Sequence, residues 1–295
     1  MTLEPEHVTL EANGVRLHCA RAGAGPLLLF LHGFPESWRC WRRQLEHFGA
    51  RGRLAAAPDL RGYGLSDKPA GEAAYRARVL VEDVRQLAAA LGGGRFALVG
   101  HDWGGAIAWA FAVAHPELLT HLVIVNSPHP YLFWRELASS PAQQAASQYM
   151  LLLRSAGAER LLSEDGHRRL WEMVSGDWGG TALGEVHRRS LRDAWAEPGA
   201  LAGGLAYYRA SPLYPPSPGD PGAAGLRLDP ADFAVRVPTL VVWGERDRAL
   251  LPGCLDGLDR CVPDLEVVRV PDASHWIVHE QPGLVTREIE RFIAR

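Results

Sequence analysis

The sequence has little of several features that would place it in a specialised class of protein. It carries 4 cysteines in 295 residues and a formal net charge of only −3. It has no apolar run near the ~18 residues that span a bilayer. Lys and Arg are scattered rather than clustered, which argues against a nucleic-acid partner. The first residues have neither the basic nor the apolar region of a signal peptide. We therefore expect a cytoplasmic protein that binds no nucleic acid and inserts into no membrane.

The few cysteines exclude most disulfide and metal frameworks. None of the four shows CxxC spacing, and they lie in apolar or helical stretches, at Cys19, Cys40, Cys254 and Cys261. This usage is typical of reduced thiols that fill core or surface positions. The sequence thus predicts no disulfide, no metal and no cofactor.

What is present favours one α/β domain with an insertion. A chain that is 47% hydrophobic and 22% charged can bury a large core. The Asn13-Gly14 pair predicts a tight hairpin near the start. Continuous apolar runs that alternate with helix-length segments then predict parallel strands covered on both faces. The expected strands lie at 27–31, 98–99, 122–125, 239–243 and 265–270, and the expected helices at 72–91, 103–115 and 281–295.

The alternation stops between about 128 and 230, where helical segments follow one another. We interpret this part as a helical cap of residues 128–228, inserted between core segments 1–127 and 229–295. Its first clear helix is expected from Ser140 to Gly157, because Ser140-Pro141 is a helix-start signature. The proline-rich stretch 211–222 is too irregular for helix or strand and is interpreted as the linker back to the core.

The most informative motif follows the predicted strand at 98–99. It reads Gly100-His101-Asp102-Trp103-Gly104-Gly105, which is the pattern of a nucleophile elbow with a carboxylate where hydrolases of this pattern usually carry serine. The small residues let the strand and the next helix approach closely and expose the central side chain. A carboxylate there can displace a leaving group from saturated carbon and form an alkyl ester. Asp102 is therefore the expected nucleophile, with epoxides and alkyl halides as leading substrates.

An aspartyl ester needs a base and an orienting acid for its hydrolysis. His275 lies in a loop after the strand at 265–270, and Asp247 follows the preceding strand in the same way. The order nucleophile, acid, histidine is the order that this type of fold gives its triad. We expect His275 to be the general base and Asp247 its orienting acid.

At this point the chain resembles the α/β-hydrolase family and, within it, the epoxide hydrolases. Nearly the whole sequence shares the resemblance. Five motifs in the family's order carry it: His32-Gly33-Phe34-Pro35-Glu36-Ser37-Trp38, Asp59-Leu60-Arg61-Gly62-Tyr63-Gly64-Leu65-Ser66, Gly100 to Gly105, Gly244-Glu245-Arg246-Asp247 and His275-Trp276. The resemblance implies an α/β-hydrolase fold with a mostly parallel sheet, flanking helices and a helical cap or lid.

The resemblance also implies roles for residues around the nucleophile. The backbone N–H groups of Phe34 and Trp103 would form the oxyanion hole, whereas His32, Arg61 and His101 would be structural neighbours. Two cap tyrosines would donate protons to the epoxide oxygen. Gln148-Tyr149-Met150 and Ala206-Tyr207-Tyr208-Arg209 match the two family segments, which assigns Tyr149 and Tyr208, with Tyr207 as a one-residue alternative. The expected substrate-binding residues are Phe34, Pro35, Trp103, Tyr149, Tyr208 and Trp276.

A phenol suits this task because it stays protonated at neutral pH yet is more acidic than the alcohol that ring opening produces. The expected reaction joins a small lipophilic epoxide and water into a vicinal diol through an ester on Asp102. The cap composition predicts an apolar pocket lined by Trp, Leu and Met. We expect a monomer or homodimer.

Two alternatives use the same residues differently. A haloalkane or fluoroacetate dehalogenase would share Asp102, Asp247 and His275. A haloalkane dehalogenase would have asparagine in place of Phe34. A fluoroacetate dehalogenase would have arginine in place of Trp103, tryptophan in place of Tyr149 and an acid in place of Asn126. A non-enzymatic ligand-binding protein on a hydrolase scaffold is the other alternative, since fold alone does not fix function.

Overall fold

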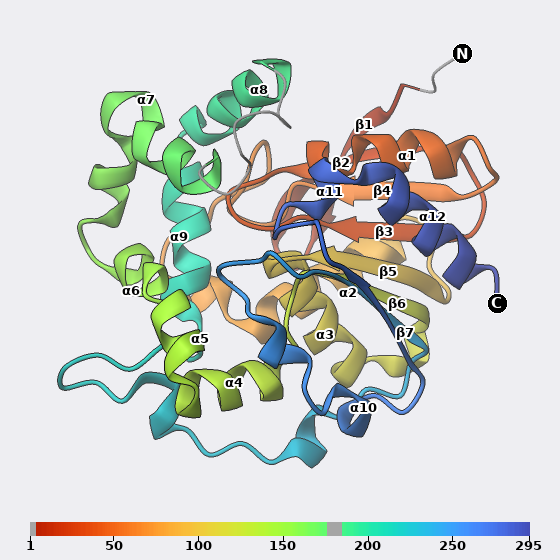
Figure 1. Cartoon of the computed structure of the whole chain (residues 1–295). Coiled ribbons are helices and arrows are strands. Elements are labelled where there is room, and N and C mark those ends of the chain that lie inside the picture. The colour runs from red at the N-terminus through yellow and green to blue at the C-terminus, as the bar shows by residue number, and fades with distance from the viewer. Residues whose placement is uncertain (1–3, 176–184) are drawn as a thin grey trace.

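The computed structural model describes residues 4–175 and 185–295 and contains an eight-stranded sheet at its centre (Figure 1). The strand order is β1-β2-β4-β3-β5-β6-β7-β8. The β1–β2 and β2–β4 pairs are antiparallel, and all other pairs are parallel. The strands are β1 (Glu6–Ala12), β2 (Val15–Ala22), β3 (Leu27–Leu31), β4 (Leu54–Pro58), β5 (Phe96–His101), β6 (Leu119–Val125), β7 (Thr239–Gly244) and β8 (Leu265–Val270). The predicted α/β class with a mostly parallel sheet is confirmed.

The first hairpin forms where the sequence predicted it. Asn13 and Gly14 join β1 to β2 and have φ angles of 50° and 74°. Two consecutive residues with positive φ produce the turn twist that matches antiparallel strands, and Asn and Gly adopt this conformation at the least cost.

All five expected later strands are present, but the sequence reasoning missed β4. The segment Leu54-Ala55-Ala56-Ala57-Pro58 is rich in alanine, which has low strand propensity. It pairs with β3 on one side and β2 on the other, so that its environment in the sheet overrides its local preference.

The helices differ from those predicted from the sequence in two places, at 72–91 and at 140–157. The α-helices are α1 (Arg42–Gly49), α2 (Ala77–Ala90), α3 (Trp103–Ala114), α4 (Pro130–Ser139), α5 (Pro141–Ala146), α6 (Tyr149–Arg154), α7 (Ala158–Ser175), α8 (Glu185–Ala196), α9 (Ala200–Ala210), α10 (Leu258–Cys261), α11 (Ile277–Glu280) and α12 (Pro282–Ile293). Short 3-10 helices are η1 (Trp38–Trp41), η2 (Glu72–Tyr75), η3 (Pro116–Leu118), η4 (Gly222–Gly225), η5 (Pro230–Phe233) and η6 (Pro252–Leu255).

One predicted helix, 72–91, is η2 followed by α2. Arg76 between them is extended, with φ −65° and ψ 145°, because Tyr75 turns into the core and its hydroxyl donates to the carbonyl of Pro69.

The other, 140–157, is divided at Ser147 into α5 and α6. The buried Gln143 side chain donates to the Ser147 hydroxyl and to the carbonyl of Ala249, which fixes α5 against the core. Helix α6 then begins at Tyr149.

The sheet separates two halves of the core. Leu27, Leu29 and Leu31 of β3 pack with α2, α3 and cap residues, whereas Leu28 and Phe30 pack with α1 and α12 on the other face. This alternation buries both faces of the central strands, as their continuous apolar runs predicted. The four cysteines are free and buried.

Helices α4 to α9 lie in the chain between β6 and β7 and gather at one side of the sheet (Figure 1). Helix α9 makes a close backbone contact with the loop after β4. A Cβ added to Gly203 would lie 2.4 Å from the carbonyl oxygen of Gly62. The Tyr207 hydroxyl donates to the carbonyl of Arg61 over 2.8 Å, and the Trp195 indole donates to the carbonyl of Pro35 over 2.6 Å. These contacts hold α9 and the end of α8 against loops that surround Asp102. The three-part division of the chain stays a prediction.

None of the helices in the described ranges is long and apolar enough to cross a membrane. The cytoplasmic location and the monomer or homodimer stay predictions. Trp178, one of the cap tryptophans, lies outside the described residues.

Candidate active site

The site is built around the turn between β5 and α3, which carries Asp102. Asp102 has φ 51° and ψ −122°, a strained conformation for a residue other than glycine. A Cβ on Gly104 would lie 2.3 Å from the carbonyl oxygen of Leu31, so that only glycine lets α3 start this close to β3. The Ser127 hydroxyl donates to the Asp102 carbonyl over 2.8 Å and supports the turn.

The two carboxylate oxygens of Asp102 have different surroundings. Oδ1 accepts the backbone N–H of Phe34 over 2.7 Å, and the backbone N–H of Trp103 also donates to this carboxylate. Oδ2 lies 3.6 Å from Nε2 of His275. One oxygen is thus close to the expected oxyanion-hole donors, and the other is close to the expected base.

His275 is held from its other side by Asp247. Nδ1 of His275 donates to Oδ2 of Asp247 over 2.7 Å. Burial disfavours the charged imidazole, but the charges of Asp247 and Asp102 outweigh this effect and raise the pKa of His275 to about 9. The structure thus brings together Asp102, His275 and Asp247 from the ends of three strands.

Asp247 is fully satisfied by hydrogen bonds. Oδ1 accepts the backbone N–H groups of Ala249 and Leu250, each over 2.9 Å, and Oδ2 also accepts Nδ2 of Asn126 over 2.9 Å. Burial would raise the pKa of Asp247, but the charge of His275 and these donors lower it. Asp247 therefore stays ionised. The sequence reasoning assigned no such role to Asn126, although its place directly after β6 was the available signal.

A buried acid behind the histidines was also missed. Glu36 Oε1 lies 2.5 Å from Nε2 of His279, and Oε2 lies 3.7 Å from Nδ1 of His101. His101 in turn donates from Nε2 to the carbonyl of His275 over 2.9 Å. Burial and the charge of His275 lower the pKa of His101 to about 3, so His101 is a neutral structural neighbour, and Glu36 adds to the negative charge that surrounds His275.

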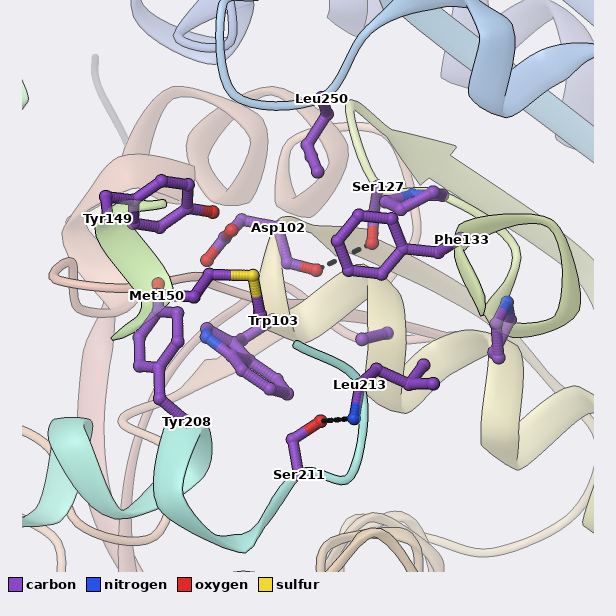
Figure 2. Close-up of a pocket in the computed structure, with 13 residues that line it drawn as sticks. Asp102, Trp103, Ser127, Phe133, Tyr149, Met150, Tyr208, Ser211, Leu213 and Leu250 are labelled. Carbon is purple, nitrogen blue, oxygen red and sulfur yellow. Dashed lines mark hydrogen bonds between the residues drawn. The ribbon is translucent and has the colours of Figure 1, made fainter. Parts of the chain in front are cut away.

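Two tyrosines of the cap face the nucleophile. Tyr149 begins α6 and Tyr208 lies in α9, and Figure 2 shows both hydroxyls pointing toward Asp102. The Tyr208 ring makes edge contacts with Phe34 and Trp103, at centroid distances of 5.2 Å and 5.1 Å. The adjacent Tyr207 bonds to Arg61 and does not line the cavity around Asp102.

The electrostatics of both tyrosines keep them protonated. Loss of solvation is the main cause that raises the pKa of Tyr149 and of Tyr208 well above the ordinary value, and the negative charge of Asp102 adds to it. A hydrogen bond from the Trp103 side chain opposes this shift at Tyr208. This contact of the indole was not expected from the sequence, which assigned Trp103 only a backbone role.

Asp102 lies between two cavities of about 80 Å³ each. Tyr149 and Tyr208 line both of them. The first is otherwise apolar at Trp103, Met150, Phe133, Leu213 and Leu250 (Figure 2). The second is lined by Phe34, Pro35, Leu153, Met173, Val174, Ala249, His275 and Trp276. The expected substrate-binding residues thus all border the site.

The sequence predicted a pocket lined by tryptophans of the cap, but the cap tryptophans in the described ranges line neither of these two cavities. Trp134 donates to the carbonyl of Ala223, Trp171 lies under the Arg188 guanidinium, and Trp195 bonds to Pro35. The tryptophans that line the two cavities, Trp103 and Trp276, belong to the core segments.

Comparison with known proteins identifies the family. Residues 26–282 match the family described as the alpha/beta hydrolase fold. Epoxide hydrolase 3 of Siraitia grosvenorii is 47% identical over 323 residues, which cover 98% of this chain and 98% of that protein. The chain belongs to the epoxide hydrolase family of the alpha/beta hydrolases.

Solved structures of epoxide hydrolases share the whole fold. The enzyme of Bacillus megaterium in complex with an inhibitor superimposes with a TM-score of 0.90 at 34% identity, covering 98% of this chain and 100% of that one. A variant of the same enzyme, complexed with its product (R)-3-[1]naphthyloxy-propane-1,2-diol, has a TM-score of 0.89 at 33% identity and the same coverage. Because 98% of this chain is covered, the shared fold includes the helices between β6 and β7 as well as the sheet.

Within residues 4–175 and 185–295, no three His, Cys, Asp or Glu side chains are grouped so that they could hold a metal ion.

Proposed function

We propose that this chain hydrolyses epoxides to vicinal diols through a covalent ester on Asp102. The observation that carries the proposal is the placement of two phenols, the buried Tyr208 and the half-buried Tyr149, opposite a carboxylate whose Oδ1 accepts a backbone N–H. This arrangement pairs a nucleophile for carbon with donors for oxygen. The names of the epoxide hydrolase relatives support the same reaction class.

In the first step Oδ2 of Asp102 attacks a ring carbon and the C–O bond to the ring oxygen breaks. The ring oxygen takes a proton from the Tyr149 or Tyr208 hydroxyl, which makes it a viable leaving group. The charge of Asp102, which holds the pKa of both phenols high, disappears as the ester forms. The phenols therefore become stronger acids as the ring oxygen becomes more basic.

In the second step water attacks the ester carbon and gives a proton to Nε2 of His275. The negative charge that develops on Oδ1 is stabilised by the N–H groups of Phe34 and Trp103. Collapse of this intermediate breaks the bond between the ester carbon and the former Oδ2, and that oxygen leaves with the diol and takes the second proton of the attacking water. The oxygen from water stays on Asp102. The proton on His275 returns to the tyrosinate, so that epoxide and water sum to the diol.

His275 must be neutral to act as this base, although its pKa in the free protein is about 9. Alkylation of Asp102 resolves the conflict. One of the two negative charges beside the imidazole is removed by the ester, and the pKa of His275 then falls. The base becomes available only after the nucleophile has reacted.

Oxygen tracing in a single turnover tests the proposal. With the enzyme in excess over a styrene-oxide-like substrate in ¹⁸O water, the label is expected in the carboxylate of Asp102, and the diol of the first turnover is expected to be unlabelled. Label found directly in that first diol would exclude the ester. Asp102→Asn is the matched variant, because it keeps the shape of the side chain and removes the nucleophilic oxygen.

A substrate panel separates epoxide hydrolysis from dehalogenation and from binding without turnover. Aromatic, aliphatic terminal and fatty epoxides are compared with haloalkanes and fluoroacetate, measuring diol and halide. Phe34 differs from the haloalkane dehalogenase pattern, and Trp103, Tyr149 and Asn126 differ from the fluoroacetate dehalogenase pattern. These differences favour diol release over halide release. Halide release that exceeds diol release would favour the dehalogenase, and neither product would favour the binding protein.

A further inference from the structure

A third cavity has Trp103 in its wall, as the first cavity beside Asp102 does, but Asp102 itself does not line it. Its volume is about 330 Å³, several times that of either cavity beside Asp102, and within the range that encloses a small ligand. Its wall comes from residues 75–80, from one face of α3, from 210–213 after α9 and from 226–233. We call this cavity the chamber.

The chamber adjoins the catalytic cavity. Five residues line both spaces: Trp103, Ala106, Pro130, Ser211 and Leu213. Figure 2 shows three of them, Trp103, Ser211 and Leu213, on one side of the catalytic cavity, below Asp102 in that view. A molecule that reacts at Asp102 thus shares part of its enclosure with the chamber.

One face of α3 forms a track from the nucleophile into the chamber. Trp103, Ala106, Ile107, Ala110 and Val113 line it and recur at helical spacing, so they project from the same side of the helix. Ten residues of helix rise correspond to about 15 Å. Alanine at two of these positions keeps the track open.

The chemistry of the chamber is that of a hydrocarbon site. Of the described residues that line it, only Asp232 carries a charge, and Tyr75 and Tyr207 use their hydroxyls on the carbonyls of Pro69 and Arg61. Protein interiors leave few voids larger than a water molecule, so an apolar space of this size is unlike a packing defect. Asp232 is exposed, so its carboxylate disfavours a negatively charged occupant by a modest amount.

We propose that the chamber is a subsite for the apolar tail of the substrate, and that the preferred substrates are terminal epoxides with an extended, uncharged hydrocarbon chain. This inference rests on the proposed function, since the epoxide ring is placed at Asp102. The ring reacts in the catalytic cavity while the chain follows α3 past Trp103 and Ala106. A chain that ends in a carboxylate is selected against at Asp232.

The test compares chain lengths in a variant that fills the chamber. For the wild-type enzyme, kcat/KM is expected to rise from 1,2-epoxybutane to 1,2-epoxyoctane by about fourfold for each added methylene. Ala110→Phe should remove most of this rise and change kcat/KM for epoxybutane by less than about twofold, because Ala110 lines the chamber and not the catalytic cavity. Ala114→Phe is the matched control, since Ala114 is exposed on the same helix. Val113→Leu fills the chamber more gently if Ala110→Phe does not fold.

The results distinguish this inference from the proposed function. If Ala110→Phe lowers kcat/KM equally for both epoxides, the chamber is not a subsite for the chain. The same follows if kcat/KM of the wild-type enzyme does not depend on chain length. Neither result contradicts the proposed function. If no epoxide is hydrolysed, the function fails. The chamber is then judged by calorimetric binding of octane-1,2-diol and butane-1,2-diol. The subsite is supported if the wild-type protein binds octane-1,2-diol more tightly than butane-1,2-diol and Ala110→Phe abolishes this difference. Equal affinities of the wild-type protein for the two diols would contradict the subsite.

The expected discrimination against negatively charged substrates is tested by comparing a neutral epoxide with a carboxylate epoxide of the same chain length. 1,2-Epoxydecane is expected to react faster than 9,10-epoxydecanoate, and Asp232→Asn should raise kcat/KM for the carboxylate by a factor of about five at most, without an effect on the neutral epoxide. A preference for the carboxylate in the wild-type enzyme would contradict the role of Asp232.

Discussion

Nε2 of His275 lies 3.6 Å from Oδ2 of Asp102, too far for a hydrogen bond but close enough for strong mutual electrostatic influence. The other oxygen, Oδ1, is held by the Phe34 N–H. The contact therefore separates an oxygen that is free to attack carbon from one that is placed to receive charge later. Each half of the proposed reaction depends on a different side of this carboxylate.

The two cap tyrosines should be required for ring opening. Tyr149→Phe and Tyr208→Phe each remove one phenolic donor beside Asp102, and each is expected to slow formation of the ester by about 10²-fold or more. The rate is measured by rapid quench in a single turnover. The rate of ester formation should fall further in the double variant, which retains neither donor.

Tyr207→Phe is the matched control for that experiment. It changes the neighbouring ring in the same helix, but its hydroxyl donates to the carbonyl of Arg61. We expect a loss of about 1 kcal/mol in the free energy of unfolding and little change in the rate of ring opening. If Tyr207→Phe and Tyr208→Phe slowed the reaction equally, the assignment of Tyr208 would be wrong.

His275→Gln should separate the two chemical steps. The variant keeps Asp102 and both tyrosines but has no base for water, so alkylation proceeds and hydrolysis stalls. Intact-protein mass spectrometry should then show a gain equal to the mass of the epoxide, and peptide mapping should place it on Asp102. The double variant Asp102→Asn, His275→Gln should gain nothing, and a mass gain in that protein would place the covalent bond elsewhere.

Much of the site could be predicted because its main residues follow strands. Asp102 directly follows β5, and Asp247 and His275 lie in the loops that follow β7 and β8. Parallel strands bring their carboxyl ends to one edge of the sheet. The β1–β2 turn was similarly accessible, because Asn13 and Gly14 fix their own backbone conformation. In each case the structural cause lies within a few residues of the motif.

The features that sequence reasoning missed depend on contacts between distant segments. The break of the cap helix at Ser147 comes from Gln143, which bonds to Ala249 more than one hundred residues away. Glu36 is positioned by its contacts with His101 and His279, which are far from it in the sequence. Strand β4 forms in spite of its alanines because strands flank it on both sides. The choice between Tyr207 and Tyr208 likewise needed the position of α9 on the core.

The pH dependence of the two half-reactions should differ. Burial raises the pKa of Asp102 above its ordinary value, and alkylation slows as the pH falls through that pKa because the carboxylate is protonated. Hydrolysis of the ester requires neutral His275, whose pKa of about 9 in the free protein falls when Asp102 is esterified. From about pH 6 to 9 the hydrolysis step should therefore accelerate more than the alkylation step.

The steady-state fraction of ester on Asp102 measures this difference. Acid quench of the enzyme during turnover, followed by mass spectrometry, should find the largest fraction at the acid end of that range and a decline toward the alkaline end. A fraction that grows with pH would show that neutral His275 does not limit hydrolysis.

The contact between Gly203 of α9 and Gly62 of the core should set the position of Tyr208. In Gly203→Ala the new methyl carbon would lie 2.4 Å from the Gly62 carbonyl oxygen, and a backbone atom cannot move aside as a flexible side chain could. Alanine favours a helix by about 1 kcal/mol over glycine, so α9 itself remains intact and is displaced as a unit. Tyr208, five residues further along α9, then moves away from Asp102, and a shift of about 1 Å is enough to cost roughly 10²-fold in rate. Gly157→Ala makes the same chemical change where no atom lies within 4 Å, and it should leave kcat/KM unchanged. Full activity of Gly203→Ala, measured beside a thermal melt to confirm folding, would show that the position of α9 tolerates the added carbon.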